Sequence, residues 1–251
     1  MDQWLFVHVM KTAGTSFRLM LEEQLAREIY PTREELAAQR GRWYLRAPEL
    51  LARVADGRLD LHRRRFVCGH YSVNLRDRLP GTWRTVVFLR EPVARTLSMI
   101  GHRQRNAGFF RRRIAPEGIA DWLKKDAFIR NQVENYQTKV LSADALANVN
   151  KRTLIDKETF EAAARNVESV DFIGLTEYFN ESISAFNDIS GMNFSAVPHA
   201  NRGKGRKPTV NDQDIEAIRR LVPYDLELYE RAREKLLARI AAQGTAARST
   251  G

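Results

Sequence analysis

The amino-acid sequence predicts a three-layer α/β domain, with a central parallel sheet flanked by helices. The first observation is that short apolar runs of strand length, such as Trp4–Val9, alternate with longer stretches that have apolar residues at helical spacing. Strands that alternate with helices form a parallel sheet covered on both faces. The second observation is the composition: 43% of the 251 residues are hydrophobic and 29% are charged, which is typical of a globular chain with a sizeable core.

The first predicted strand, Trp4–Val9, is followed by a turn and an amphipathic helix from Thr15 to Ile29. Residues 30–65 are polar and basic, and we interpret them as an excursion over the edge of the sheet. The other predicted strands are Phe66–Gly69, Thr85–Leu89 and Asp171–Leu175. The other predicted helices are Glu34–Arg40, Pro48–Val54, Pro92–Arg103, Pro116–Lys125, Phe128–Leu141, Lys157–Val167, Asn180–Ile189, Asp212–Leu221 and Tyr224–Ile240.

We expect residues 1–242 to form one domain and residues 243–251, rich in Ala, Thr, Ser and Gly, to be a disordered tail. Cys68 is the only cysteine, so an intramolecular disulfide and a multi-thiolate zinc site are excluded. The apolar run Trp4–Val9 is far shorter than the roughly 20 residues of a membrane span. We therefore expect no integral membrane segment and a cytoplasmic location.

The chain carries a formal net charge of +10, which favours an anionic partner. Nucleic acid, an acidic membrane surface, a nucleotide and a polyanionic sugar all meet that condition. We find no helix-turn-helix, zinc-finger, RRM or KH signature that would organise nucleic-acid recognition. We therefore expect an anionic partner other than nucleic acid. A non-enzymatic basic nucleic-acid-binding protein is kept as the alternative function.

The turn after the first strand has the residues of an anion-binding loop. Lys11, the backbone amides, and the hydroxyls of Thr12, Thr15 and Ser16 lie at the start of a helix, where free N–H groups and partial positive charge favour a phosphate. The loop is not a Walker A sequence, because Lys11 precedes Gly14, the only glycine of the loop, whereas the Walker lysine follows the glycines. A P-loop-type ATP-dependent kinase is the alternative enzyme class, although its Walker lysine and magnesium-holding acid are not found.

Two segments give the chain a resemblance to a known family. His8-Val9-Met10-Lys11-Thr12-Ala13-Gly14-Thr15-Ser16 resembles the phosphosulfate loop of carbohydrate sulfotransferases, in particular the group of heparan sulfate and uronyl 2-O-sulfotransferases, with Met10 in place of the usual proline. Residues 87–98 resemble the strand–Arg–acid–Pro–helix element that binds the 3′-phosphate of 3′-phosphoadenosine 5′-phosphosulfate (PAPS) in those enzymes. Weaker similarity continues in order to about residue 235, in Phe66–His70, Asn135–Thr138, Phe172–Phe179 and Pro223–Tyr229.

The resemblance implies a P-loop-like fold and transfer of a sulfuryl group from PAPS to a hydroxyl of a carbohydrate or glycoconjugate, without a metal. It implies that His70 is the general base and that Lys11 stabilises charge on the leaving group. Imidazole has a pKa suited to proton transfer near neutral pH. The residues implied in donor binding are Lys11, Thr12, Ala13, Gly14, Thr15, Ser16, Arg90, Ser98 and, in a late basic loop, Lys204, Gly205 and Arg206.

Other interpretations of these residues remain open from the sequence. His70 could be a hydrogen-bonded structural histidine, with Glu91 as the first alternative base, and Arg90 could pair with Glu91 or a neighbouring acid. His8, inside the first strand, is expected to be a hydrogen-bonded core residue or a residue that supports the site without contacting the reacting groups. Two arginine clusters could contact an anionic acceptor: Arg63–Arg65 and Arg111–Arg113.

Overall fold

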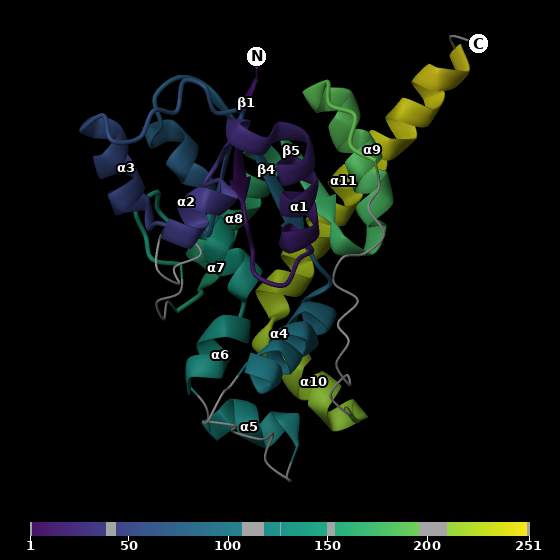
Figure 1. The fold of residues 1–251 in the computed structure, drawn as a ribbon. Helices are drawn as coiled ribbons and strands as arrows, with labels where there is room; N and C mark the ends of the chain where they lie inside the picture. Colours follow the sequence, from purple (N-terminus) through teal and green to yellow (C-terminus); the bar gives the residue numbers. More distant parts are fainter. Residues whose placement is uncertain are drawn as a thin grey trace.

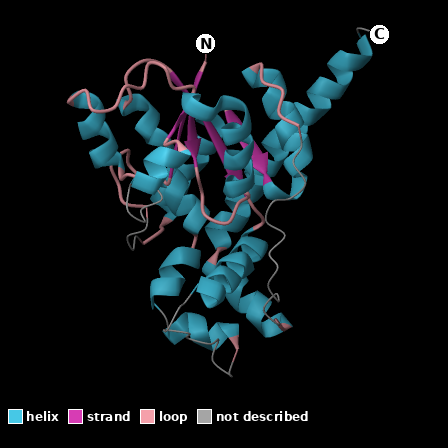
Figure 2. Ribbon diagram, viewed as in Figure 1, coloured by secondary structure: helices cyan, strands magenta, loops and turns pink. Residues whose placement is uncertain are grey.

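The computed structural model describes residues 2–38, 44–106, 118–125, 127–149, 154–195 and 210–249. Its centre is a five-stranded, all-parallel sheet in the order β2-β3-β1-β4-β5, enclosed by helices (Figure 2). The three-layer α/β fold predicted from the sequence is confirmed. The strands are β1 Gln3–Val7, β2 Ile29–Tyr30, β3 Phe66–Gly69, β4 Trp83–Leu89 and β5 Phe172–Leu175.

The helices follow the predicted order along the chain (Figure 1). Their bounds are α1 Gly14–Leu25, α2 Arg33–Ala38, α3 Ala47–Ala55, α4 Pro92–Asn106, α5 Ile119–Lys125, α6 Ala127–Val133, α7 Tyr136–Ser142, α8 Lys157–Ser169, α9 Phe179–Ser190, α10 Asp212–Leu221 and α11 Pro223–Ser249. Short 3₁₀ turns lie at Ala26–Glu28, Val73–Arg78 and Thr176–Tyr178.

Aromatic residues fill the layer between the sheet and α1 and α9. Phe17 of α1 lies with its ring centroid 4.9 Å from Phe6 and 4.9 Å from Phe88, and 5.4 Å from Phe186 of α9. Side chains on a strand alternate between faces, so every second residue of β1 and β4 faces this layer. Helices α7, α8 and α11 pack against one another and cover the sheet's other face (Figure 1).

Four helices, α4, α5, α6 and α10, form a second packed group beyond the carboxyl ends of the strands (Figure 1). They enclose a small core of their own, to which Met10 of the loop after β1 also packs. The buried members are Val93, Met99, Ile100, Ile119, Trp122, Leu123, Ile129, Val133, Ile218 and Val222. This group therefore borders the sheet edge at which ligands bind in parallel α/β folds.

Three predicted helices differ from the structure. The helix expected to continue to Ile29 ends at Leu25, because Ala26 has a φ of 40° and Ile29 pairs with Phe66 as a short edge strand. The helix expected over Phe128–Leu141 is two helices, α6 and α7, with a break at Asn135.

Asn135 has a φ of 41°, and its side-chain oxygen accepts hydrogen bonds from the backbone N–H groups of Tyr224 and Asp225. The break thus allows Asn135 to cap the start of α11. That helix begins at Pro223 and ends at Ser249, whereas the sequence predicts its end at Ile240 and a tail over residues 243–251.

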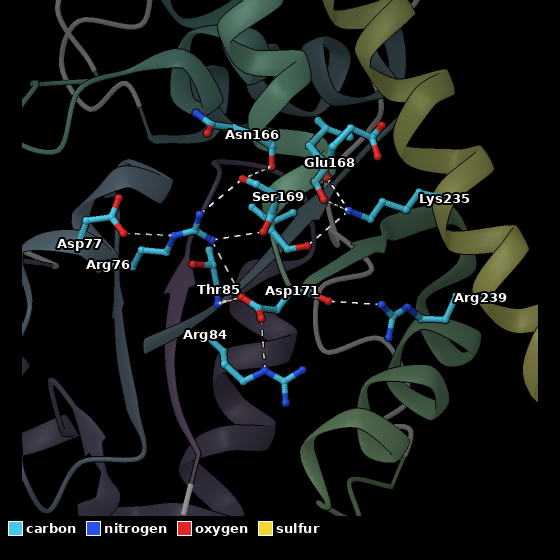
Figure 3. Close-up of polar contacts among 12 residues, drawn as sticks. Arg76, Asp77, Arg84, Thr85, Asn166, Glu168, Ser169, Asp171, Lys235 and Arg239 are labelled. Atoms are coloured by element: carbon cyan, nitrogen blue, oxygen red, sulfur yellow. Dashed lines mark hydrogen bonds and ion pairs between the residues drawn. The ribbon is translucent and has the colours of Figure 1, made fainter. Parts of the chain in front are cut away.

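A polar cluster fixes the opposite, amino-terminal edge of the sheet (Figure 3). Asp171, just before β5, accepts hydrogen bonds from the backbone N–H of Thr85 at 2.8 Å and from Nε of Arg84 at 3.3 Å. Nearby, Lys235 of α11 donates to the carbonyl of Val167 at 2.8 Å, near the end of α8. These contacts join β4, β5, α8 and α11 far from the carboxyl edge.

Candidate active site

The two motifs singled out in the sequence meet where the connections of neighbouring strands diverge. After β1 the chain continues to β2 at one end of the sheet, and after β4 it continues to β5 at the other end. Such a topological switch point is where parallel α/β folds bind their ligands. The loop of Lys11 follows β1, and Arg90 follows β4; Nη1 of Arg90 is 3.4 Å from the carbonyl oxygen of Lys11.

The loop between β1 and α1 has an unusual backbone. Lys11 and Ala13 have φ values of 71° and 62°, so both have a left-handed backbone conformation, and Thr12 between them does not. Alternation of this kind turns successive N–H groups to one side and makes an anion-binding concavity. The Thr12 hydroxyl is buried and donates to the carbonyl of Val9 at 2.9 Å, so this side chain fixes the loop from within.

Helix α1 continues from this loop. The N–H groups of Ser16 and Phe17 donate to the carbonyl of the N-cap residue Ala13, so the N–H groups of Gly14 and Thr15 precede the first helical hydrogen bond. N–H groups in that position attract anions to helix N-termini. Lys11 is partly exposed, Thr15 is exposed and Ser16 is buried. The predicted donor-loop residues are therefore together, at one helix start on the carboxyl edge.

Arg90 is held from both its backbone and its side chain. Gln137 accepts from the Arg90 N–H at 2.9 Å and donates to the Arg90 carbonyl at 2.8 Å, so α7 fixes the backbone after β4. The Arg90 Nε lies 3.8 Å from the carboxylate of Glu177, which also accepts from the hydroxyl of Tyr229. The sequence alternative of an ion pair for Arg90 is thus present, with Glu177 as the acid.

Glu91 caps helix α4. Its carboxylate accepts from the backbone N–H groups of Val93 at 3.0 Å and Ala94 at 2.6 Å. This geometry is that of an N-cap acid, whose negative charge is stabilised at the helix start. The carboxylate of Glu91, the alternative base named from the sequence, is therefore engaged as the cap of α4.

His70 lies next to His8, because the strand register pairs Val7 with Gly69 and leaves one histidine after each strand. The two ring centroids are 4.9 Å apart. Nδ1 of His70 donates to the His8 carbonyl at 2.6 Å, since a carbonyl oxygen can only accept. Neutral His70 therefore carries its proton on Nδ1 and has the lone pair on Nε2, which is the tautomer a general base requires.

Burial lowers the pKa of His70 below its usual 6.5, against the opposing effect of the hydrogen bond to His8. The neutral, proton-accepting form is thus favoured at pH 7. Burial, followed by the charges of His70, Arg18 and Lys11, lowers the pKa of His8 much further. Both rings are therefore neutral near neutral pH.

The ring of His8 also covers the start of α1. A Cβ atom added to Gly14 would lie 2.1 Å from Cδ2 and 2.3 Å from Nε2 of His8. Nδ1 of His8 is 3.0 Å from the hydroxyl of Tyr44, which holds the ring in place. Gly14 is thus required by the close approach of His8, which is packed and hydrogen-bonded beside the loop, in agreement with the sequence prediction.

For the remaining predicted residues, the structure gives fewer contacts with the Lys11 loop or no description at all. Ser98 lies partly exposed in α4, in the second turn after Arg90. Lys204, Gly205 and Arg206 lie outside the described residues, as does the Arg111–Arg113 cluster. The cluster Arg63–Arg65 precedes β3 at the amino-terminal edge of the sheet, away from the carboxyl edge.

Two of the three arginines in that cluster already have structural partners. Arg64 pairs with Glu35 at 2.8 Å and donates to the Ile29 carbonyl, while Arg65 pairs with Glu28 at 3.8 Å. These contacts fix the edge strand β2 beside β3. We therefore assign this cluster to the edge of the fold and not to acceptor binding.

Sequence reasoning missed several residues that shape the site. Gln137 falls in a weakly similar segment but carries no signal that it would hold Arg90. Arg95 lies within the segment 87–98 but was given no role, because a charged residue on a helix is usually exposed; this one is fully buried. Tyr44 and Glu177 contribute through tertiary contacts that no local pattern reveals.

Within the described part of the chain, no group of three or more His, Cys, Asp or Glu side chains is arranged to hold a metal ion. In the same residues, every helix is too short or too polar to cross a bilayer.

Comparison with known proteins gives one informative similarity. The chain is similar to heparan-sulfate 6-O-sulfotransferase 2 of Danio rerio, with 26% identity over 277 aligned residues that cover 95% of this chain. The chain spans 58% of the length of that relative. No protein-family model matches the chain. The similarity supports a relationship to the carbohydrate sulfotransferases as a family and does not single out the 2-O group favoured by the sequence resemblance.

Proposed function

We propose that this protein is a PAPS-dependent sulfotransferase that transfers a sulfuryl group to a hydroxyl of a carbohydrate or glycoconjugate. The observation that carries the proposal is the contact between the Lys11 loop and Arg90 at the switch point of the sheet. The proposed anion-binding elements, the Lys11 loop and the Arg90 segment, meet there. A nucleotide with phosphates on both the 3′ and 5′ positions of its ribose needs two such elements close together. The Danio rerio relative, by its name a sulfotransferase, supports the same class.

In this proposal the loop Lys11–Ser16 and the start of α1 bind the 5′-phosphosulfate. Arg90 and Ser98 bind the 3′-phosphate, and Arg90 exchanges part of its interaction with Glu177 for that ligand. Lys204, Gly205 and Arg206 are proposed to cover the bound nucleotide. The chemistry that PAPS supplies is an activated sulfuryl group with a stable phosphate as its leaving group.

The acceptor hydroxyl loses its proton to Nε2 of His70 as its oxygen attacks the sulfur. The bond between sulfur and the bridging oxygen of the 5′-phosphate breaks, and the electron pair of that bond stays on the phosphate of the product 3′,5′-bisphosphate (PAP). The Lys11 ammonium stabilises this developing charge, as preorganised cations do in related transfers. The Nδ1 hydrogen bond to the His8 carbonyl keeps Nε2 free to accept the proton.

The proposed acceptor is an anionic carbohydrate. The relative is named for heparan sulfate, a polyanionic polysaccharide, and the net charge of +10 on this chain would attract such a polymer. This part of the proposal concerns the acceptor class and is separate from the donor.

A thermal-shift comparison of PAP with ATP and magnesium tests the donor class. At a PAP concentration of about 100 times its Kd, binding adds roughly 2.7 kcal/mol to stability, which raises the Tm by roughly 5–10 °C for a chain of this size. We expect no comparable shift with ATP and magnesium or with duplex DNA. Stabilisation by ATP and magnesium but not by PAP would overturn the proposal in favour of a kinase, and stabilisation by DNA alone would favour the nucleic-acid alternative.

A further inference from the structure

A buried arginine lies directly behind the Lys11 loop. Arg95, in the first turns of α4, has no exposed surface. Its Nε donates to the carbonyl of Met10 at 3.1 Å, and its Nη2 donates to the carbonyl of Gln132 in α6 at 2.9 Å. The guanidinium is 4.2 Å from the ring centroid of Tyr136. Because it is fully enclosed, Arg95 cannot touch a nucleotide and can act only through the groups it holds.

Those contacts fix the direction of the loop's peptide groups. In a trans peptide the C=O and the following N–H point to opposite sides. Arg95 holds the Met10 carbonyl, so the N–H of Lys11 is turned away from Arg95. Arg90 holds the Lys11 carbonyl in the same way, at 3.4 Å, and so turns the N–H of Thr12. Two arginines of one strand–helix element thus orient two successive N–H groups of the loop.

The charge of Arg95 is poorly compensated. Its Nη1 is buried and has no hydrogen-bond partner among the described residues. A second buried cation, Lys139, lies 5.0 Å from the centroid of the same Tyr136 ring and donates to the carbonyl of Asn131. Burial lowers the pKa of Arg95, and the nearby carboxylate of Asp225 opposes this effect.

Burying a charge without a full set of partners costs stability. A neutral side chain of similar size would fill the same space without that cost. Because the guanidinium lies directly behind the loop, its charge adds positive potential at the loop and its Nε holds the Met10 carbonyl away from the side where an anion would bind.

We propose that Arg95 is a positioning residue of the donor site, which orients the Lys11 amide toward the 5′-phosphate of the nucleotide through the Met10 carbonyl, beside the Thr12 amide that Arg90 orients through the Lys11 carbonyl. This inference rests on the proposed function, since it concerns how the same donor is held. It predicts that substitution of Arg95 weakens binding of the 5′-phosphate and leaves binding of the 3′-phosphate nearly unchanged.

The test measures the Kd of three ligands by calorimetric titration: PAP, adenosine 5′-monophosphate and adenosine 3′-monophosphate. In Arg95→Met we expect about 10-fold weaker binding of the two ligands that carry a 5′-phosphate, which corresponds to loss of one charge-assisted hydrogen bond. Binding of the 3′-monophosphate should change less than twofold. Ser98→Ala should give the reverse pattern, with weaker binding of the two ligands that carry a 3′-phosphate.

Two further variants separate positioning from a loss of folding. Lys139→Met removes the other buried cation beside Tyr136, yet it should leave the three Kd values in their original ratios. Arg95→Lys keeps a hydrogen-bond donor that can reach one of the two carbonyls. Its binding of the ligands that carry a 5′-phosphate should therefore be stronger than that of Arg95→Met and weaker than that of the parent. If Arg95→Met does not fold, the three Kd values of Arg95→Lys are compared with those of Lys139→Met. A 5′-selective weakening is then expected in Arg95→Lys alone.

Equal weakening of all three ligands in the Arg95 variants, or unchanged binding of all three, would overturn the positioning role while the donor assignment stood. Failure of the parent protein to bind PAP would instead overturn the proposed function itself. The 5′-selective pattern in Arg95→Met, absent from Lys139→Met, would support the proposal.

Discussion

The substitution Gly14→Ala tests the packing of His8 on the donor loop. By helix propensity alone, alanine should be favoured over glycine at this position by up to about 1 kcal/mol. The structure predicts the opposite sign. A Cβ atom at position 14 would lie 2.1 Å from Cδ2 of His8, about 1.3 Å inside an ordinary contact of 3.4 Å.

The ring of His8 has little room to move away. It is hydrogen-bonded to Tyr44, stacked on Phe6 at 5.5 Å, and 4.9 Å from His70. Overpacking a well-packed site costs about 1–3 kcal/mol, and losing the hydrogen bond to Tyr44 would add about 1 kcal/mol. We therefore expect Gly14→Ala to lower the free energy of unfolding by about 1–3 kcal/mol after the gain in propensity.

Urea denaturation of Gly14→Ala, His8→Ala and the double variant measures this coupling. In the His8→Ala background the clash is removed, so alanine at position 14 should be neutral or stabilising, which gives a coupling energy of at least about 1 kcal/mol. Parent-like stability of Gly14→Ala, or an equal cost in both backgrounds, would refute the reasoning.

Three further predictions concern the chemistry and the fold. Lys11→Ala should lower kcat by about 10²-fold or more through loss of a preorganised cation, measured as PAP release in steady-state assays; a parent-like kcat would remove Lys11 from the chemistry. For His70, neutral imidazole is the active form and burial lowers its pKa from 6.5, so kcat/KM should fall toward acidic pH with a midpoint below 6.5. In His70→Ala, turnover should fall by about 10²–10⁴-fold with nearly unchanged PAP affinity, and the acidic limb should vanish; turnover within a fewfold of the parent would exclude His70 as the base. Asp171→Ala, at the opposite edge of the sheet (Figure 3), leaves the Thr85 N–H without its acceptor and should cost about 1–3 kcal/mol in urea denaturation, with unchanged kcat per folded molecule; a loss of kcat would show that the two edges are coupled.

The fold was predictable because most elements carry local signals. The apolar runs at β1, β3, β4 and β5 and the helix at Asp212–Leu221 follow directly from periodicity and turn residues. The two-residue strand β2 was missed, because Ile29 ends a helical pattern and Tyr30 begins a polar, basic stretch, and the two residues become a strand only by pairing with β3. The break at Asn135 was missed for a similar reason, since its cause is a hydrogen bond to α11, about 90 residues away in the sequence.

The candidate site was predictable only in part. The Lys11 loop and Arg90 could be assigned to one sheet edge, because the carboxyl ends of parallel strands meet there. The tautomer of His70 and the burial of Arg95 depend on tertiary contacts, so local sequence patterns do not reveal them. The cap formed by Glu91 is a local contact with Val93 and Ala94 that the sequence analysis did not identify. The roles of Lys204, Gly205 and Arg206, the domain limits and the cytoplasmic location stay predictions from the sequence.

Transfer of a ³⁵S-labelled sulfuryl group from PAPS to a carbohydrate tests the central claim most directly. The parent protein, Lys11→Ala and His70→Ala would be incubated with labelled PAPS and, separately, an unsulfated heparan-type polysaccharide, a chondroitin-type polysaccharide and a neutral glucan. We predict label on an anionic polysaccharide with the parent, a loss of about 10²-fold or more in both variants, and little label on the neutral glucan. Equal labelling by the parent and both variants, or no label on any acceptor by a protein that binds PAP, would contradict the account.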